Sequence, residues 1–408
     1  MSEDGRQDVR RRRVFYIPGY DPFPPRRYRE LYRREAARQA AISGYRIALT
    51  AAEGQGWRVA GEFGGARVES RFEVLVWSDI VRDSMGRSIA ASYGQLLRTA
   101  WIYLASGALP RLFRLRKGPV IAALYPVVML LLQLALAAAL GLAAAGLTGR
   151  ALGAALPPAV AVPVQGVVLT TVLAAVLAWF RARDGRVFAY YLMHDYAFTT
   201  AMRGAYPPRL EARLAEFAKR IAEALGSDAD EVLVVGHSSG AHLAVSVLAG
   251  LIRRGQVRPG GPLLALLTLG QVVPMVSFLP AATRLRADLR LLSESDALSW
   301  VDVSAPGDGC SFALCDPVAV SGVAGSGRRW PLVISAAFRQ TLLPQTWARL
   351  RWRFFRLHFQ YLCAFDRPGD YDYFRITAGP LSLARRFAGR APSRSRIETP
   401  LSGHRSLA

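Results

Sequence analysis

Cysteine and histidine are both scarce in this chain of 408 residues. It contains five histidines and three cysteines, Cys310, Cys315 and Cys363. Three cysteines are too few, and odd in number, for a disulfide framework, and none stands in the Cys-x-x-Cys spacing of a zinc site. The sequence therefore favours a reducing compartment over a disulfide-bonded secreted fold.

A signal peptide is also lacking. Residues 1–13 are strongly charged and lead directly into Val14-Phe15-Tyr16-Ile17-Pro18-Gly19. The apolar core and small-residue cleavage site of a secretory signal do not occur there. We therefore expect residues 1–13 to form a basic segment ahead of the folded domain, and the mature chain to begin in the cytoplasm.

Acidic residues are outnumbered, with 30 Asp and Glu against 52 Lys and Arg, which gives a formal net charge of +22. Such charge suits an anionic surface, either nucleic acid or anionic lipid. No helix-turn-helix, zinc-finger or RNA-binding aromatic motif accompanies it. Because arginines flank long apolar segments, we expect a lipid bilayer as the partner and no nucleic acid.

Two long apolar segments occupy residues 119–147 and 157–180. About 20 apolar residues suffice to cross a bilayer. Both segments are apolar around the whole circumference of a helix, whereas a surface helix has one apolar face; buried core helices are the alternative. The pattern predicts a transmembrane hairpin within residues 111–186, with enough Ala and Gly for close packing of its two helices.

Basic residues stand on the outer side of both segments. They are Arg111, Arg114, Arg116, Lys117, Arg181, Arg183 and Arg186. The connection between the segments offers only Arg150, so the positive-inside rule places both flanks in the cytoplasm. We expect an integral membrane protein with cytoplasmic termini and soluble parts, and the Arg- and Ala-rich composition fits a bacterial inner membrane.

Short β-branched segments alternate with helical patterns outside the hairpin. The predicted strands are 14–17, 69–76, 231–235, 263–269, 300–303 and 332–334, and the predicted helices are 28–41, 210–225, 241–251 and a long aromatic one at about 345–364. This alternation indicates an α/β fold with a mostly parallel sheet covered by helices. We expect one such domain, formed by residues 14–110 and 187–390, followed by a disordered tail at 391–408.

A glycine-rich junction, Gly236-His237-Ser238-Ser239-Gly240, follows the predicted strand at 231–235 and precedes a helical pattern. Small residues two positions before and after the serine leave room for a strained strand-to-helix turn. A phosphate-binding turn is the alternative, but the Lys-Ser/Thr ending of a P-loop is missing. The junction resembles the nucleophile elbow of the α/β-hydrolase superfamily, with Gly236 and Gly240 as its two glycines.

The resemblance implies that Ser238 is a nucleophile activated by a histidine and an acid. In the superfamily the order is serine, acid, histidine, so His194, His237 and His242 are misplaced and only His358 and His404 follow. His358 is favoured because it comes after the last predicted strand among aromatic residues. A helix histidine that faces polar neighbours or lipid headgroups is the alternative.

The acid is expected just after the predicted strand 300–303, where Asp308 is favoured over Asp302 and Asp316. For each of them ordinary turn chemistry is the alternative. The backbone N–H groups of Ser239 and Tyr20 are the expected oxyanion donors. The Tyr20 assignment rests on Pro18-Gly19, which resembles the family's early glycine loop although Pro18 stands where a histidine is common.

The resemblance further implies an acyl-ester substrate, an acyl-enzyme intermediate, and no metal or organic cofactor. Combined with the hairpin, this predicts a membrane-anchored, lipase- or esterase-like serine hydrolase. An acyltransferase of the same fold and a non-catalytic membrane scaffold are the alternatives, since fold does not choose the reaction. The sequence carries no signal for an oligomeric state.

Overall fold

The computed structural model of the chain describes residues 8–52, 56–86, 88–152 and 157–408. Within them the chain folds as two units. Unit 1 comprises Met1–Arg82, Leu104–Pro119 and Met202–Ala408, and unit 2 comprises Asp83–Tyr103 and Val120–Ala201. The sequence of unit 1 is therefore interrupted twice by segments of unit 2.

Unit 1 is built on an eight-stranded sheet with the order β2-β3-β4-β1-β5-β6-β7-β8. The strands are β1 (Arg11–Ile17), β2 (Arg46–Ala51), β3 (Gly56–Phe63), β4 (Ala66–Val74), β5 (Glu231–His237), β6 (Leu263–Leu269), β7 (Ser299–Ser304) and β8 (Leu332–Ser335). The pairs from β4 to β8 are parallel, whereas β2–β3 and β3–β4 are antiparallel. The prediction of an α/β fold with a mostly parallel sheet is confirmed.

The central strands are apolar because both of their faces are covered. Every residue of β5 and of β7 is buried, as expected for parallel strands between two helical layers. The β2–β3–β4 part was predicted only at its last strand. The missed hairpin turn is Gly64-Gly65, whose positive φ angles of 55° and 86° fit a tight two-residue connection between strands.

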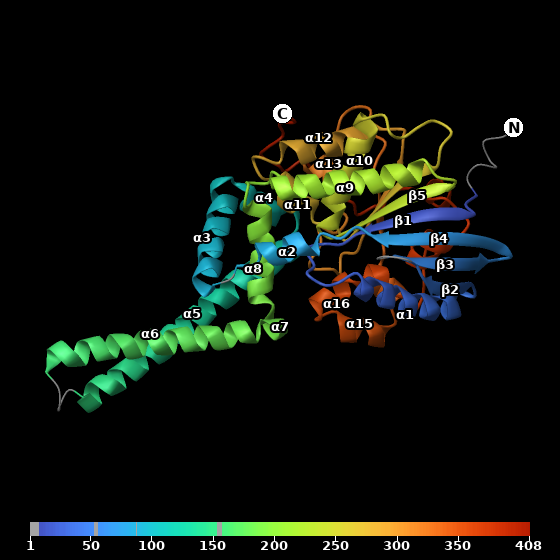
Figure 1. Cartoon of the computed structure of the whole chain (residues 1–408). Helices are drawn as coiled ribbons and strands as arrows, with labels where there is room; N and C mark the ends of the chain where they lie inside the picture. The colour runs from blue at the N-terminus through green and yellow to red at the C-terminus, as the bar shows by residue number, and fades with distance from the viewer. Residues whose placement is uncertain (1–7, 53–55, 87, 153–156) are drawn as a thin grey trace. The chain divides into compact units, whose positions relative to one another are not determined.

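Helices cover both faces of this sheet (Figure 1). One face carries α9 (Pro208–Leu225), α10 (Gly240–Arg253) and α12 (Thr283–Glu294), and the other carries α1 (Arg26–Ser43), α15 (Pro344–Leu350) and α16 (Phe354–His358). The remaining short helices of the chain are α2 (Ser78–Ser84), α4 (Ala108–Leu115), α7 (Asp184–Val187), α11 (Val273–Ser277), α13 (Pro317–Val320), α14 (Phe338–Thr341), the 3₁₀ helix η2 (Gln360–Leu362), α17 (Tyr373–Ala378) and α18 (Leu383–Arg386).

The predicted long helix at 345–364 was wrong. It is divided into α15, α16 and η2, with a turn at residues 351–353 between the first two. The aromatic residues that suggested one continuous helix instead pack in different directions. Tyr361 belongs to the buried core, while Trp352 and Phe354 are exposed.

Two segments that were expected to lie outside the folded domain contain residues that are buried in unit 1. Arg12, within the expected basic segment, is a fully buried residue of β1. Residues 391–408 also differ from the expected disordered tail. The Ile397 N–H donates to the Leu314 carbonyl at 2.7 Å, and the side chain of Ser402 is buried.

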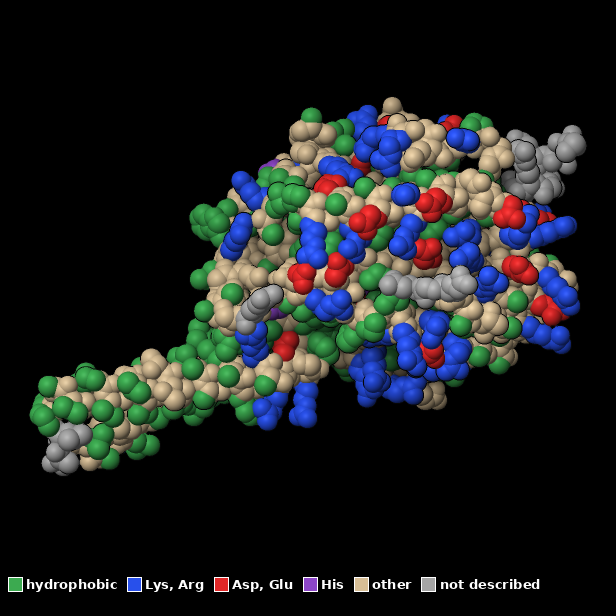
Figure 2. Space-filling model, viewed as in Figure 1, with side chains coloured by type: hydrophobic (Ala, Val, Ile, Leu, Met, Phe, Trp, Pro, Cys, Tyr) green, Lys and Arg blue, Asp and Glu red, His purple; other side chains and the backbone are tan. Residues whose placement is uncertain are grey.

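Unit 2 contains all but the first three residues of α5 (Lys117–Leu152) and the whole of α6 (Pro158–Ala182). Both helices are long and apolar enough to cross a membrane. Only 22% and 11% of their most apolar windows are buried, whereas a soluble core helix would be mostly buried. Hydrophobic side chains dominate the surface of this pair (Figure 2). A Cβ on Gly141 of α5 would lie 2.8 Å from the side chain of Leu169 on α6, so the two helices are in close contact.

Two further helices of unit 2, α3 (Ile89–Ala105) and α8 (Ala189–Thr200), were not predicted individually. They pack with α5 through a small apolar cluster that includes Leu96, Leu130 and Met193. The hydroxyl of Tyr93 donates to the carbonyl of Leu130 at 2.8 Å. Unit 2 is therefore a helical assembly larger than the hairpin alone.

Candidate active site

Ser238 lies at the carboxyl end of β5, at the turn into α10. Its φ angle is 56°, a left-handed conformation that residues other than glycine rarely adopt. The Ser238 N–H donates to the Leu269 carbonyl at 2.9 Å, and the Ala241 N–H donates to the Ser238 carbonyl at 3.1 Å. These bonds hold a strained backbone, and such strain clusters at functional sites.

The flanking glycines are required by close backbone contacts. A Cβ on Gly236 would lie 2.7 Å from the Cα of Ala241, and a Cβ on Gly240 would lie 2.1 Å from the carbonyl oxygen of Ile17. No side chain fits at either position without moving the backbone. The spacing Gly-x-Ser-x-Gly thus has the steric cause that the sequence pattern suggested.

The loop after β1 lies against the serine. A Cβ on Gly19 would lie 2.9 Å from the Cβ of Ser238. The Trp77 indole N–H donates to the Pro18 carbonyl at 2.9 Å, and the Asp21 carboxylate accepts the Tyr28 hydroxyl at 2.6 Å. This loop is therefore held in place beside Ser238, where the N–H of Tyr20, with that of Ser239, stays the predicted oxyanion donor.

His358 and Asp308 form a buried hydrogen-bonded pair. His358 Nδ1 lies 2.8 Å from Asp308 Oδ2, at the end of α16 and in the loop after β7 respectively. Burial alone would raise the pKa of Asp308, but the nearby His358, its hydrogen bond and the Cys310 N–H outweigh burial and hold that pKa below 3.8. An ionised Asp308 makes Nδ1 the donor, so Nε2 of a neutral His358 can accept a proton.

Two contacts bring this pair to the elbow. His237 Nε2 lies 3.0 Å from the His358 carbonyl oxygen. A Cβ on Gly270, which follows the Leu269 that binds Ser238, would lie 3.1 Å from His358 Cε1 and 3.3 Å from Asp308 Oδ2. No hydrogen bond joins Ser238 to His358 among the residues that the structure describes. Catalytic contacts of this kind often tighten only when substrate binds.

The arrangement therefore supplies a strained serine, a buried carboxylate–imidazole pair, and a backbone loop beside the serine. This combination suits nucleophilic attack on an acyl carbonyl. No protein-family model, curated protein or solved structure matches this chain. The case for its function consequently rests on the geometry of this site.

The alternative candidates for the base and the acid, His404, Asp302 and Asp316, lie away from the hydrogen bond between His358 and Asp308. His404 lies in the C-terminal segment, and its Nε2 is 3.2 Å from the Ser106 carbonyl oxygen. Asp302 lies inside β7, where it accepts the Thr268 hydroxyl at 2.6 Å, and Asp316 caps α13. Of the three candidate acids, Asp308 alone bonds a histidine in the described part of the chain.

Two further residues, Tyr361 and His237, lie beside the pair of His358 and Asp308. The Tyr361 hydroxyl donates to Asp308 Oδ2 at 3.0 Å, so it shares the acid with His358. His237 is buried, and desolvation, followed by the electrostatic effect of the nearby His358 ring, lowers its pKa to about 3. Since a carbonyl oxygen only accepts, the neutral His237 carries its proton on Nε2 and fixes the backbone of His358. Tyr361 gave no sequence signal beyond its closeness to His358.

Asp308, Cys310 and His358 also have donor atoms within 4.8 Å of one another, which is close enough for a metal ion. Burial, followed by the charge of Asp308, raises the pKa of the Cys310 thiol well above its usual value. Both oxygens of Asp308 already accept hydrogen bonds, from His358 and Tyr361 and from the Cys310 N–H. The donor set fits a hydrogen-bonded catalytic pair better than a metal site.

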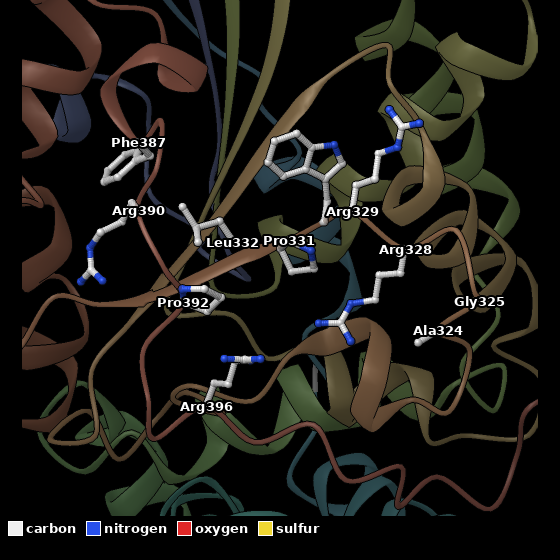
Figure 3. Close-up of a pocket in the computed structure, with 11 residues that line it drawn as sticks. Ala324, Gly325, Arg328, Arg329, Pro331, Leu332, Phe387, Arg390, Pro392 and Arg396 are labelled. Carbon is white, nitrogen blue, oxygen red and sulfur yellow. The ribbon is translucent and has the colours of Figure 1, made fainter.

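A separate pocket of about 550 Å³ lies beside β8 (Figure 3). Four arginines line it: Arg328, Arg329, Arg390 and Arg396. Three of them pair with carboxylates, Arg328 and Arg396 with Glu398 and Arg390 with Asp370. Its lining includes none of Ser238, His358 and Asp308, and its charge is largely balanced.

Gly19→Ala is expected to lower the rate of ester hydrolysis more than it lowers the stability of the fold. The new methyl group would lie 2.9 Å from Ser238 Cβ and 3.4 Å from its Oγ, so the loop and the serine must move apart. Displacements of this size cost about 10- to 100-fold in rate. Gly226→Ala, where the nearest atom would be 3.6 Å away, is the control. Equal ester hydrolysis by both variants would contradict the proximity of this loop to the reaction.

Asp302→Asn is expected to change how stability depends on pH. Burial, with a smaller contribution from Asp316, raises the pKa of Asp302 to about 8, against 3.8 for the free group. The protonated form is thus favoured by folding, and the wild type loses stability as the pH rises from about 4 to about 8. The asparagine variant keeps that stability, so its advantage should grow to several kcal/mol across this window. Thermal unfolding in detergent at pH 5 and pH 8 measures this effect, and identical shifts at both pH values would refute it.

Proposed function

We propose that this chain is a membrane-anchored serine hydrolase that cleaves an acyl ester, in particular a lipid ester, through an acyl-enzyme on Ser238. The observation that carries the proposal is the 2.8 Å bond between His358 Nδ1 and Asp308 beside a serine with a φ of 56°. A bond of this kind fixes the tautomer of the imidazole, which leaves Nε2 as the base.

In this mechanism His358 Nε2 takes the proton of the Ser238 hydroxyl while Oγ attacks the carbonyl carbon of the ester. The N–H groups of Ser239 and Tyr20 stabilise the oxyanion of the tetrahedral intermediate. That intermediate collapses to the acyl-enzyme, and the alcohol leaves with the proton from His358. A water molecule, deprotonated by His358, then releases the acid and restores Ser238.

The membrane part of the proposal rests on α5 and α6. Their length, apolarity and exposed side chains fit two lipid-crossing helices, and the basic residues around them favour a cytoplasmic site. Anchoring a hydrolase at a bilayer raises its effective concentration near lipid esters. A lipid acyl ester is therefore the preferred substrate class.

A fluorophosphonate probe tests the nucleophile directly, because it reacts with an activated serine. Full-length protein in detergent should be labelled, and Ser238→Ala should lose the label. His404→Ala is the matched control and should keep it, since its Nε2 faces the Ser106 carbonyl. Labelling of Ser238→Ala at the wild-type level would reject the proposal and favour a non-catalytic scaffold.

A further inference from the structure

The turn between α15 and α16 exposes large aromatic side chains. Trp352 is 72% exposed and Phe354 is 50% exposed. They alternate with three exposed arginines, Arg351, Arg353 and Arg356. Exposed tryptophan and phenylalanine in one short segment mark an interaction surface, and we refer to residues 351–356 as the aromatic turn.

The aromatic turn is directly connected to the catalytic pair. Phe354 begins the five-residue helix α16 that ends at His358. On its other side, a Cβ on Gly309 would lie 3.7 Å from the Phe354 ring, and Gly309 follows Asp308 in the chain. Phe354 therefore begins the helix that carries His358 and lies beside the residue that follows Asp308.

The loop that carries Asp308 also contacts the beginning of α5. A Cβ on Gly118, the second residue of that helix, would lie 3.5 Å from the Cα of Gly309. The Arg116 guanidinium donates to the Ala313 carbonyl at 2.9 Å. Residues 104–119 belong to unit 1, so both contacts lie within that unit. Gly309 thus has the aromatic turn as one neighbour and the start of the apolar helix as another.

The chemistry of the aromatic turn matches one surface, the boundary between headgroups and acyl chains in an anionic leaflet. Tryptophan prefers that boundary because its ring is apolar and its N–H is polar. Arginine side chains pair with lipid phosphates while their stems cover apolar surface. The Arg351 guanidinium lies 5.5 Å from the centre of the Trp352 ring, so charge and ring are presented together. Basic side chains also gather over the neighbouring α1 and α15 (Figure 2).

We propose that Trp352 and Phe354 insert into an anionic lipid leaflet, with Arg351, Arg353 and Arg356 bound to its phosphates. The substrate is then a phosphate-bearing acyl lipid that reaches Ser238 from this leaflet. The substrate part rests on the proposed function, whereas the lipid contact does not. A soluble protein partner for the aromatic turn is the competing outcome.

The lipid contact is tested by photocrosslinking in full-length protein in nanodiscs that contain about one third phosphatidylglycerol. Benzoylphenylalanine replaces Trp352 in one sample and Ile42 in the other. Ile42 is a matched control because it is 41% exposed and lies at the far end of α1, next to the antiparallel edge of the sheet. We expect lipid adducts at position 352 and none at position 42. Equal adducts at both positions, or none at 352, would overturn the proposal.

The substrate part is tested with the variant W352E and the control I42E. We expect at least a tenfold loss of hydrolysis of phosphatidylglycerol in vesicles and less than a twofold loss on p-nitrophenyl butyrate in solution. Equal losses on both esters, or no loss on vesicles, would overturn delivery from the leaflet. A wild type inactive on both esters would instead reject the proposed function, and the crosslinks would still decide the lipid contact.

Discussion

Replacing His358 with alanine is expected to lower the kcat for ester hydrolysis by about 10⁴- to 10⁶-fold. Without the imidazole, no group accepts the Ser238 proton, and the hydroxyl stays a weak nucleophile. The measurement is steady-state turnover of p-nitrophenyl butyrate by full-length protein in detergent. Ser238→Ala should lose a similar factor, because the two residues act as one unit.

Asp308→Asn removes the negative charge of the carboxylate but keeps the shape of the side chain beside His358. The amide keeps the shape but favours the wrong tautomer of His358, so we expect a loss of about 10⁴-fold. Tyr361→Phe removes one hydrogen bond to Asp308 and should cost far less. His404→Ala should retain wild-type turnover. If His404→Ala alone abolished activity, Ser238 would remain the nucleophile and His358 would not be its base.

Replacing Arg12 with methionine is expected to cost about 3–5 kcal/mol of unfolding free energy. Arg12 and Glu231 form an ion pair between β1 and β5, and both side chains are buried. The guanidinium also donates to the carbonyls of Gly379 and Leu381, each at 2.8 Å. The variant leaves the Glu231 carboxylate buried without its cation. An uncompensated buried charge of this kind is what destabilises the folded state.

Chemical denaturation of the full-length protein in detergent, monitored by circular dichroism, measures this loss of unfolding free energy. Arg220→Met is the control, because the Arg220–Glu73 pair is partly exposed and its loss should cost less than about 1 kcal/mol. The double variant R12M/E231M should recover part of the stability, since no uncompensated charge remains. Equal losses for Arg12→Met and Arg220→Met would contradict this account.

The elbow was predictable because its causes are local. Neighbouring residues alone indicate the apolar strand, the two glycines and the following helix. The two long apolar helices are likewise indicated by continuous stretches of sequence. Arg12 illustrates the opposite case. An arginine near a charged terminus predicts exposure, and only the distant Glu231 and two carbonyls make its burial favourable.

The partners of Ser238 were less predictable for the same reason. The order serine, acid, histidine left His358 and His404 as candidates, and the position after a predicted strand favoured Asp308. Tyr361 and Gly270 meet Asp308 and His358 only through folding. The strands β2 and β3 were missed because they form the antiparallel edge of the sheet. No residue of β2 is fully buried, and in β3 the exposed Arg58 and the half-buried Glu62 interrupt the apolar pattern. The proposed oxyanion donors and the lipid contact stay predictions.

The sheet has a consequence for biosynthesis. Its central strand β1 lies between β4 and β5, and α5 and α6 are encoded between these two neighbours. A ribosome therefore delivers both apolar helices before it has made β5, the elbow and the catalytic pair. If α5 and α6 cross the membrane as proposed, they can anchor the chain there before the ribosome has synthesised Ser238. On the proposed function, newly made chains would then become able to cleave lipid esters only once they are at the membrane.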